Sequence, residues 1–527
     1  MDLIGYAWLA ARYGIDPVQR LRTRSSVGHS KTSREESGVD VRTYPAVMRP
    51  SAETAAHLSF ALKHEGIHLE FLARLFAAID PRDLDRWIAA EPTGQYARRA
   101  GFLYEWLTGS RLDFAGVTMG NYVEALDPDA YLTATSPIGN SRWRVRDNLP
   151  GTREFCPTVA LSEKVVDAAR FDCAQQLQDM QAEFGDDTLL RSAVWMTLKE
   201  SKSSFEIERE SDQTDRIRRF ASAMAARCGL EENPVGAEAL ERLQRDILGS
   251  KVLSGYGLRR GPVFVGESSP FGEIVHYVAP HWDKVEPMLA GLRAFEVKTR
   301  GAPAVLRAGV MSFGFVFIHP LGDGNGRVSR FLINDTLRRD GAVPAPFILP
   351  VSVRMLDARM HPMNYDQVLE LYSRPIMARY RERYKFGDVV DSPAGARYNF
   401  HFDAYEDAQF AWAYPDLTDQ VAYMGQVIVE TLRDEMRQEA AYLAAWRSAR
   451  QAIKDIVEGS DHDIDRIIRA VLGSGRMSNK LVKEFEILAD PQIGEQVLQA
   501  VRASGLPIAP ETAGPAVKPA APRPGVG

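Results

Sequence analysis

The residues best suited to chemistry lie in segment 319–330, HPLGDGNGRVSR. The imidazole of His319 has an ordinary pKa near neutrality, so it could take a proton from a hydroxyl nucleophile. Asp323 offers the hard carboxylate oxygen that Mg²⁺ prefers when it bridges phosphates. Arg327 and Arg330 lie three positions apart, and their guanidinium forks match phosphate oxygens better than lysine would. A base, a metal ligand and a charge clamp in one segment favour phosphoryl or nucleotidyl transfer.

A glycine-rich loop separates the histidine from the arginines. Gly322, Gly324 and Gly326 allow the backbone to adopt positive φ and to direct successive N–H groups at one place. The helix expected directly behind this loop would present its positive N-terminus there, which makes an anion-binding concavity. The loop is not a Walker A motif, because GxxxxGK[ST] is absent.

Three elements must position this segment. Residues 304–318, AVLRAGVMSFGFVFI, are nearly all apolar and predict a buried helix, which ends at His319 because Pro320 cannot continue it. Residues 327–337 have the pattern of an amphipathic helix. Upstream, the β-prone runs 263–265 and 274–278 flank a turn-forming ESSPFGE and predict a β-hairpin.

With these residues in view, the segment resembles the Fic family motif HPFx[D/E]GNGRxxR, with Leu321 in place of the phenylalanine. Leucine keeps an apolar anchor at that position. The resemblance extends over about residues 200–370. It implies a mainly α fold, a Fic-type helical core with a small β-hairpin flap, flanked by helical N- and C-terminal domains. Fic proteins commonly transfer AMP from ATP to a protein hydroxyl, so it also implies ATP and Mg²⁺ as ligands.

The resemblance gives each motif residue a role. His319 would deprotonate the target Ser, Thr or Tyr, Asp323 would hold Mg²⁺, Gly324, Asn325 and Gly326 would cradle the phosphates, and Arg327 and Arg330 would bind the β- and γ-phosphates. The hydroxyl would attack the α-phosphorus and pyrophosphate would leave. Asn334 and the helix containing Tyr365 resemble nucleotide contacts of the family. Val263, Phe264 and Val265 resemble the flap that holds the target by strand addition.

A second segment, residues 202–210 (KSSFEIERE), resembles the inhibitory motif [S/T]xxxE[G/N] that precedes the core in some Fic enzymes. Ser204 and Glu208 match it, whereas Arg209 replaces the glycine or asparagine. By resemblance Glu208 would pair with Arg330 and displace the γ-phosphate, since one carboxylate can occupy a fork that a phosphate needs. The alternative from the residues alone is a solvated acidic helix face.

Composition narrows the remaining function classes. The net charge of −6 and pI near 6.0 give no basic field of the kind that coats nucleic acid. Cys156, Cys173 and Cys228 form no CxxC pair, which argues against a disulfide scaffold or a cysteine-rich zinc site. No run approaches the roughly 18 apolar residues that span a bilayer. We therefore expect no membrane partner and a cytoplasmic location.

Periodicity and composition also divide the chain. The predicted parts are a mostly helical N-terminal region (1–160) with a polar loop at 24–43, a Fic domain with inhibitory helix and flap (161–385), a helical or winged-helix-like region (386–505) and a disordered Pro/Ala-rich tail (506–527).

The function expected from this reading is an autoinhibited protein adenylyltransferase whose partner is a protein substrate, which includes the chain itself. Removal of AMP or transfer of another nucleotide or phosphate-linked group is an alternative within the enzyme class. A nucleotide-sensing regulatory or DNA-associated binding protein is the alternative of another class. DNA contact would use Arg476, Lys480 and Lys483 in the C-terminal region, where packing and homodimer formation are equally open.

Overall fold

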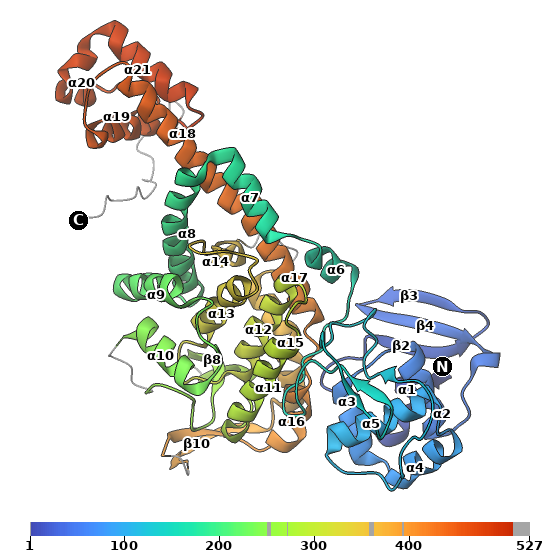
Figure 1. Ribbon diagram of the computed structural model, residues 1–527. Coiled ribbons are helices and arrows are strands. Elements are labelled where there is room, and N and C mark those ends of the chain that lie inside the picture. The colour runs from blue at the N-terminus through green and yellow to red at the C-terminus, as the bar shows by residue number, and fades with distance from the viewer. Residues whose placement is uncertain (1, 250–254, 271, 358–362, 393–394, 510–527) are drawn as a thin grey trace. The chain divides into compact units, whose positions relative to one another are not determined.

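The computed structural model describes residues 2–249, 255–270, 272–357, 363–392 and 395–509. The described chain is mainly helical, as the sequence predicts, and its strands form four small sheets (Figure 1). It divides into two compact units, one made of Met1–Ala174 and Thr197–Thr431, the other of Gln175–Met196 and Leu432–Gly527. Within the described ranges, none of the helices combines the length and apolar character that crossing a membrane requires.

The larger unit begins with helices around a single apolar core. These are α1 (Tyr6–Tyr13), α2 (Thr54–His64), α3 (Leu69–Ala78), α4 (Pro81–Ala90) and α5 (Gln95–Thr108). Helix α3 is the central one, because nearly all of its side chains are buried. Leu72 and Leu75 of α3, Ile88 of α4 and Leu103 of α5 lie in this core and are almost fully shielded from solvent.

The predicted polar loop at 24–43 is wrong, because this segment is mostly strand. The sheet has the order β1–β2–β4–β3 and consists of β1 (Leu3–Ile4), β2 (Thr23–Gly28), β3 (Thr32–Glu36) and β4 (Val39–Pro45). Strand β2 pairs in parallel with β4, and β3 pairs antiparallel with β4. Of the apolar side chains in β4, Val41 and Tyr44 are buried, while β3 is exposed along most of its length. Backbone pairing therefore forms strands that hydrophobic patterning does not reveal.

A second small sheet lies in the irregular stretch between α5 and α6 (Glu163–Ala169). Its strands are β5 (Val123–Glu124), β6 (Ile138–Asn140) and β7 (Val145–Asp147), in the order β5–β7–β6. Trp143, just before β7, is fully buried and belongs to the N-terminal core. The N-terminal region is thus helical with two sheets, which differs from the mostly helical region expected.

Helix α12 (Ala304–Ile318) is the centre of the remaining part of the larger unit. It packs against α11 (Val285–Lys298), α13 (Asn325–Arg339) and α17 (Thr418–Glu430). Almost every side chain of α12 is buried, as its apolar sequence predicts. Around this centre lie α9 (Thr214–Arg227), α10 (Ala237–Leu248), α14 (Val351–Leu356), α15 (Tyr365–Tyr380) and α16 (Tyr405–Ala413).

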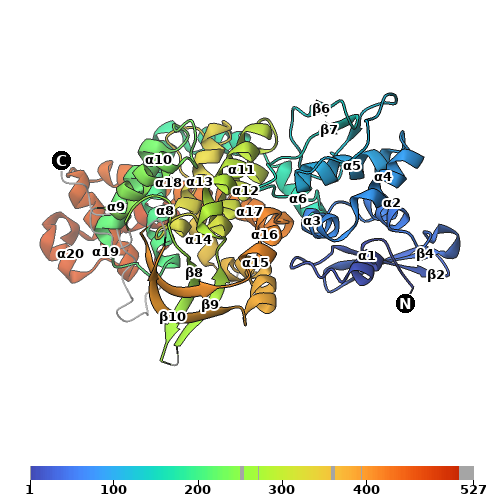
Figure 2. The ribbon, with the colours of Figure 1, turned by 90° about the horizontal axis from the view of Figure 1, so that it is seen from below.

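Two β-hairpins lie side by side (Figure 2). The predicted hairpin is confirmed: β8 (Phe264–Ser269) pairs antiparallel with β9 (Gly272–Val278). A second hairpin of β10 (Tyr384–Asp391) and β11 (Arg397–Phe402) begins where a helical region was expected. Phe264 of the first hairpin contacts Phe386 and Phe400 of the second, with ring centroids 5.4 and 4.8 Å apart. The period-two aromatics of RYNFHF are the signal that could have revealed it.

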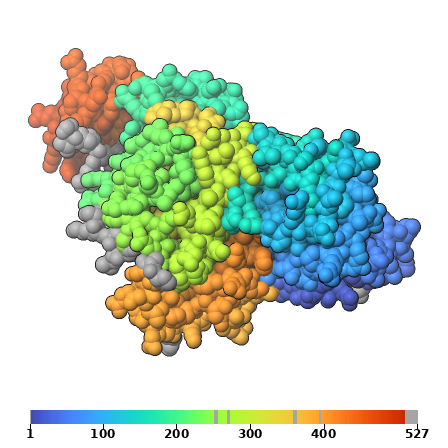
Figure 3. All heavy atoms as spheres, turned by 60° about the horizontal axis from the view of Figure 1, so that its bottom comes forward, coloured from blue at the N-terminus to red at the C-terminus, as the bar shows by residue number. Residues whose placement is uncertain are grey.

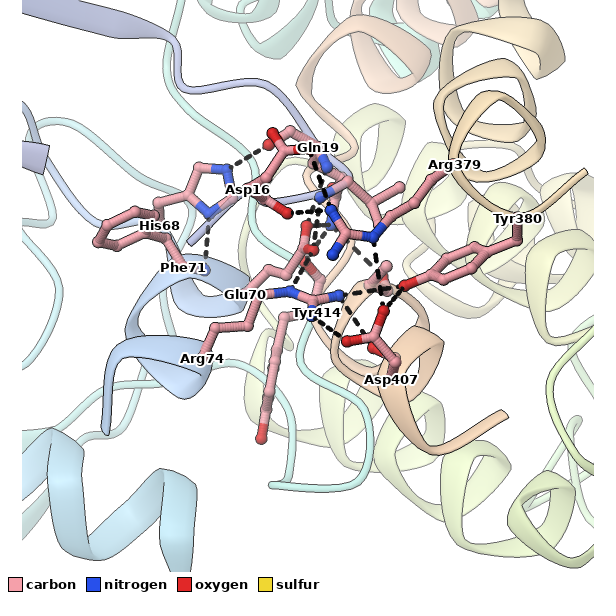
Figure 4. Close-up of polar contacts among 12 residues, drawn as sticks. Asp16, Gln19, His68, Glu70, Phe71, Arg74, Arg379, Tyr380, Asp407 and Tyr414 are labelled. Atoms are coloured by element: carbon pink, nitrogen blue, oxygen red, sulfur yellow. Dashed lines mark hydrogen bonds and ion pairs between the residues drawn. The ribbon is translucent and has the colours of Figure 1, made fainter. Parts of the chain in front are cut away.

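The N-terminal region is joined to the helical core by a buried polar network (Figure 4). The Glu70 carboxylate accepts hydrogen bonds from the backbone N–H groups of Val18 and Gln19 at 2.7 and 2.9 Å. It also accepts from Nε of Arg74 at 3.0 Å, and Arg74 donates onward to Asp407 on α16 at 2.8 Å. On the face shown in Figure 3, the blue N-terminal region lies directly against the core.

The smaller unit contains most of α7 (Cys173–Phe184), the first part of α8 (Asp186–Ile207), α18 (Arg437–Lys454), α19 (Asp461–Ser474), α20 (Asn479–Glu484) and α21 (Pro491–Ala503). Its apolar core gathers isoleucines of α19 with Val497 and Val501 of α21. The region predicted to be helical or winged-helix-like is 386–505. Its first part belongs to the hairpin of β10 and β11, and the described residues 403–509 contain no strand, so they fit the helical alternative. Of the predicted disordered tail, residues 510–527 lie outside the described residues.

Candidate active site

Helix α12 ends at the predicted base. His319 adopts the left-handed conformation, with φ of 50°, and so turns the chain out of the helix before Pro320. Its Nδ1 lies 3.2 Å from the carbonyl oxygen of Val316, which can only accept a hydrogen bond. The proton is therefore on Nδ1, and Nε2 is left with a free lone pair. Burial lowers the pKa of His319 to about 4, and the nearby cation of Arg259 adds to this effect. The imidazole is neutral at pH 7, as a general base must be.

The glycine loop leads directly into α13. Gly324 precedes the helix with φ of 89° and no side-chain cap, so the first N–H groups of α13 have no capping side chain. Asn325 uses its carboxamide to staple the loop, accepting from Leu321 N–H at 3.0 Å and donating to Leu321 O at 2.8 Å. Its contribution to a phosphate cradle would therefore come from its backbone. A Cβ at Gly326 would meet the Glu208 carboxylate, so the absence of a side chain here leaves room for Glu208 beside Arg330.

Both motif arginines are buried at the start of α13. Arg330 is fully buried, and its Nε donates to Ser204 Oγ at 2.6 Å. Its Nη2 donates to the Ser204 carbonyl at 3.1 Å and to Glu208 Oε1 at 2.6 Å, as predicted for the inhibitory pair. Within the described residues, Nη1 of Arg330 has no hydrogen-bond partner. A buried guanidinium with an open donor is a strong attractor for an anion.

The end of α8 explains the unusual Arg209. The N–H of Glu210 bonds to the carbonyl of Phe205 at 2.9 Å, and the N–H of Arg209 bonds to that of Glu206 at 3.0 Å. These two bonds form a Schellman motif, whose C′ residue adopts the left-handed conformation. That residue is Arg209, with φ of 59°. Glycine and asparagine suit this position because positive φ costs them little, so the expected motif and the observed turn agree.

Charge holds Glu208 in place. Burial alone would raise the pKa of Glu208, but the Arg330 guanidinium outweighs it and leaves the pKa below the usual range. About two turns earlier on α8, Glu200 accepts from the N–H and Oγ of Ser352 at 2.7 and 2.6 Å, which ties the helix to the start of α14. The last part of α8 is thus held at two points about two turns apart.

The other motif arginine, Arg327, is paired with Glu210, a contact that the sequence does not predict. Glu210 Oε2 accepts from Arg327 Nη1 at 2.7 Å, and Arg216 of α9 lies 3.5 Å from the same oxygen. The Arg327 guanidinium also lies over the Phe205 ring, 5.0 Å from its centroid. The acidic run was its only sequence signal. Glu208 and Glu210 reach neighbouring arginines because α8 ends at Ile207 and the chain turns between them.

Asp323, the predicted Mg²⁺ ligand, is partly exposed and accepts from Arg327 Nη2 at 2.9 Å. In the described ranges no three His, Cys, Asp or Glu side chains gather as a metal site. A single, partly exposed carboxylate at the glycine loop fits Mg²⁺, which usually takes one or two protein carboxylates together with phosphates and waters. The donor set therefore fits an ion that is completed by a nucleotide.

The two loosely predicted nucleotide contacts have other partners. The Asn334 carboxamide is buried and bonds to both the carbonyl and the N–H of Leu349, at 3.2 and 2.8 Å. Tyr365 is buried at the start of α15, with its ring 6.1 Å from that of Phe313. Both side chains pack against elements next to α13. Contact of either one with a nucleotide stays a prediction.

The hairpin predicted as the flap starts beside the catalytic loop. Leu258 forms an isolated antiparallel bridge with Leu321, and the carbonyl of Val263 accepts from the N–H of Ala279 across the base of the hairpin. Val265 and Ile274 are exposed apolar residues on its strands. The predicted flap residues Val263, Phe264 and Val265 therefore lie at the base and the first strand of a hairpin joined to the catalytic loop.

Residues 237–337, which run from the start of α10 into α13, match the family model described as the Fic/DOC family. The chain contains a Fic domain. The matched residues include the flap and the whole segment 319–330, so the family resemblance of the motif is confirmed. Residues 204–210, predicted as the inhibitory segment, lie before the matched range.

Over 127 residues the chain is similar to part of the protein adenylyltransferase fic-1 of Caenorhabditis briggsae, with 29% identity. This match spans 24% of the present chain and 23% of that relative. Among solved structures, a Fic family protein from Desulfovibrio desulfuricans has 17% identity and a TM-score of 0.33, covering 65% of this chain and 85% of its own. A Fic domain containing signaling protein from Bacteroides thetaiotaomicron has 14% identity and a TM-score of 0.30, covering 53% and 94%.

Proposed function

We propose that this protein is an adenylyltransferase that moves AMP from ATP to a hydroxyl of a protein, and that Glu208 inhibits it by occupying Arg330. The observation that carries the proposal is the arrangement within segment 319–330. A neutral imidazole with a free Nε2 stands at one end of a glycine loop, and two buried arginines stand at the other. The similarity to the protein adenylyltransferase fic-1 of Caenorhabditis briggsae supports the same reaction.

The residues of this chain perform the transfer as follows. The target hydroxyl loses its proton to Nε2 of His319 as its oxygen bonds to the α-phosphorus of ATP. The bond between the α-phosphorus and the bridging oxygen breaks, and pyrophosphate leaves. The N–H groups at the start of α13, with Arg327 and Arg330, hold the charge of the β- and γ-phosphates. When bound through Asp323, Mg²⁺ would neutralise part of the phosphate charge.

Inhibition follows from competition between Glu208 and the γ-phosphate for Arg330. In the observed state Glu208 bonds to its guanidinium at 2.6 Å. A γ-phosphate would need the same donors, and two anions cannot share them without repulsion. ATP would then bind with its γ-phosphate displaced, and the α-phosphorus would not align with the hydroxyl. Glu208 therefore lowers the transfer rate and does not merely weaken ATP binding.

The test is intact-protein mass spectrometry after incubation with Mg²⁺ and each nucleoside triphosphate in turn. We expect the Glu208→Gly variant to gain the mass of AMP at least tenfold faster than the wild type. His319→Ala in the same background should gain none, because general base catalysis contributes about 10²–10⁴-fold. Glu206→Gly is the matched control, since Glu206 is exposed on the same helix end. It should leave the rate unchanged.

Other outcomes select the alternatives. A mass gain that does not correspond to AMP would show transfer of another phosphate-linked group. Loss of AMP from a previously modified protein, without any gain, would show the reverse reaction. If Glu208→Gly binds ATP yet modifies nothing, including a panel of candidate target proteins, the transferase proposal is wrong and a nucleotide sensor remains.

A further inference from the structure

The C-terminus of α12 is capped by residues of the hairpin segment. A helix leaves its last carbonyls without intrahelical partners. Here the Tyr277 hydroxyl on β9 donates to the carbonyl of Phe317 at 2.5 Å. Arg259 provides donors for the next three carbonyls. Its Nη2 lies 3.5 Å from Ile318 O, and its Nε donates to His319 O at 2.8 Å. Its backbone N–H donates to Pro320 O at 2.9 Å. The backbone of the predicted base is therefore fixed from outside its own helix.

The same guanidinium holds both ends of the hairpin. Arg259 Nη1 donates to the carbonyl of Gly261, just before β8, at 3.2 Å. Its Nη2 donates to the carbonyl of Pro280, just after β9. One side chain thus joins the two ends of the flap and the residue that carries the catalytic imidazole. Few side chains other than arginine present enough donors, in a fixed plane, to make this set of bonds.

The electrostatic setting of Arg259 is unusual. The residue is almost fully buried, and in the described part of the chain no carboxylate forms an ion pair with it. An unpaired buried cation is costly unless other groups compensate it. Its compensation comes from carbonyl oxygens and the negative end of the α12 dipole. Such an arrangement is a poor way to gain stability alone, so a role in geometry is the better explanation.

His319 needs this support because of its backbone. Positive φ is costly for a residue other than glycine, and such strain persists where surrounding bonds impose it. The charged groups that act on the imidazole are Arg259 from the hairpin segment, Glu208 from the end of α8, and Asp323 from the glycine loop. Tyr277 on β9 and Tyr405 on α16 are the titratable groups that interact electrostatically with Arg259.

We propose that Arg259 is a positioning residue that fixes the flap and His319 as one body, so that a hydroxyl in a segment bound to the flap is presented to Nε2. This inference rests on the proposed transfer reaction for its consequence, but not for its geometry. The phosphate-binding groups lie on α13 and the glycine loop, and Arg259 bonds to neither.

The test compares Arg259→Gln, Arg259→Lys and Arg260→Gln in the full chain carrying Glu208→Gly. Arg260 is the adjacent, exposed arginine and serves as the matched control. With labelled ATP, Arg259→Gln should lower kcat for self-modification about 10- to 100-fold, because small displacements of reacting groups cost this much. The KM for ATP should stay within about twofold. Arg259→Lys, which keeps the charge and part of the donor set, should recover part of the rate.

Hydrogen exchange measured by mass spectrometry gives a readout that does not depend on transfer. In Arg259→Gln, residues 255–280 and 315–322 should exchange faster together, while α13 and the N-terminal helices stay as in the control. If only one of the two segments changes, or neither does, the coupling is wrong. If exchange rises throughout the domain and kcat and KM change together, Arg259 is merely structural. If no variant transfers AMP but the two segments still change together, the proposed reaction fails while the coupling stands.

Discussion

Two buried arginines join separate parts of this chain: Arg74 bonds from α3 to Asp407 on α16, and Arg330 bonds from α13 to the end of α8. Each arginine is also paired with a glutamate, and the two glutamates differ in their exposure to solvent. Where the N-terminal region meets the core, Glu70 is 0% exposed and its partner Arg74 is 8% exposed. Glu70 accepts backbone as well as side-chain hydrogen bonds. At the end of α8, Arg330 is 0% exposed but Glu208 is 34% exposed. Within the described residues Glu208 accepts one hydrogen bond, from Arg330.

The joint at Arg74 is therefore permanent, whereas the joint at Arg330 can be released. Removing Glu70 from its contact would strand a buried arginine and several backbone donors, and no soluble ligand can replace it there. Glu208 can return to water at little cost, whereas Arg330 cannot. Arg330 keeps its bonds to the Oγ and the carbonyl of Ser204 when Glu208 leaves, and the phosphate of a nucleotide can then take the place of the carboxylate. A buried cation with an exchangeable anion is thus the physical basis of the proposed inhibition.

The largest effect should come from breaking the permanent joint. Glu70→Ala is expected to lower the free energy of unfolding by about 3–5 kcal/mol, because it leaves Arg74 buried without its full set of partners. Urea unfolding followed by tryptophan fluorescence measures this. Glu208→Ala should cost only about 1 kcal/mol by the same assay, as half-exposed pairs do. Equal losses in the two variants would show that the distinction between the joints is wrong.

A second prediction concerns the buried carboxylate that ties α8 to α14. Burial raises the pKa of Glu200 to about 7. Because the folded pKa lies above the unfolded value, the folded chain binds the extra proton, and stability falls as pH rises from about 4.5 to 7 and then levels off. Glu200→Gln imitates the protonated form. It should stabilise the protein by about 1–3 kcal/mol at pH 8 and by nothing measurable at pH 5.

Thermal unfolding at the two pH values, with Glu206→Gln as the control, measures the Glu200 effect. The same proton should tighten the hold on the helix end, so basal AMP transfer should be lower in Glu200→Gln than in the wild type at pH 8. A Glu200→Gln variant that is less stable than the wild type at pH 8 would show that the ionised carboxylate is the form the fold requires.

A smaller effect is expected at the second exposed carboxylate. Glu210→Gln removes the charge that pairs with Arg327, so the apparent affinity for ATP should rise about threefold, as expected for a partly exposed ion pair. Isothermal titration with ATP and Mg²⁺ in the His319→Ala background measures binding without turnover. Glu206→Gln is again the control. Weaker ATP binding in Glu210→Gln would instead mean that Glu210 holds Arg327 in its binding position.

The sequence predicts those parts of the site whose signals are local. The apolar run of α12, the break at Pro320 and the glycine loop each fix their own geometry through short-range sterics. The pairing of Glu208 with Arg330 came from a family resemblance, and the observed contact at 2.6 Å agrees with it. The bonds of Arg259 could not be predicted, because they depend on which carbonyls the fold brings near one side chain.

The strands at residues 23–45 were missed for a related reason. Thr32–Glu36 carries no apolar alternation, and its conformation comes from pairing with a neighbouring strand. In the sequence Glu210 looks like any surface glutamate. Its contact with Arg327 could not be predicted, because it exists only after the turn at Arg209 is formed. Hydrophobic patterning predicts which residues are buried. It does not predict structure that is determined by backbone pairing or by a turn.

An effect of similar size is expected at the turn itself. Arg209 has φ of 59°, which is costly for a side chain with a Cβ and nearly free for glycine. Arg209→Gly should therefore stabilise the observed helix end by about 0.5–1 kcal/mol, since the greater freedom of glycine in the unfolded chain offsets part of the gain. Because this turn places both Glu208 and Glu210, basal AMP transfer should fall about two- to fivefold, the rate equivalent of that energy. Arg209→Ala removes the charge but keeps the Cβ, so it should leave the rate near that of the wild type. If both variants slow transfer equally, the side-chain charge and not the backbone conformation is what matters at this position.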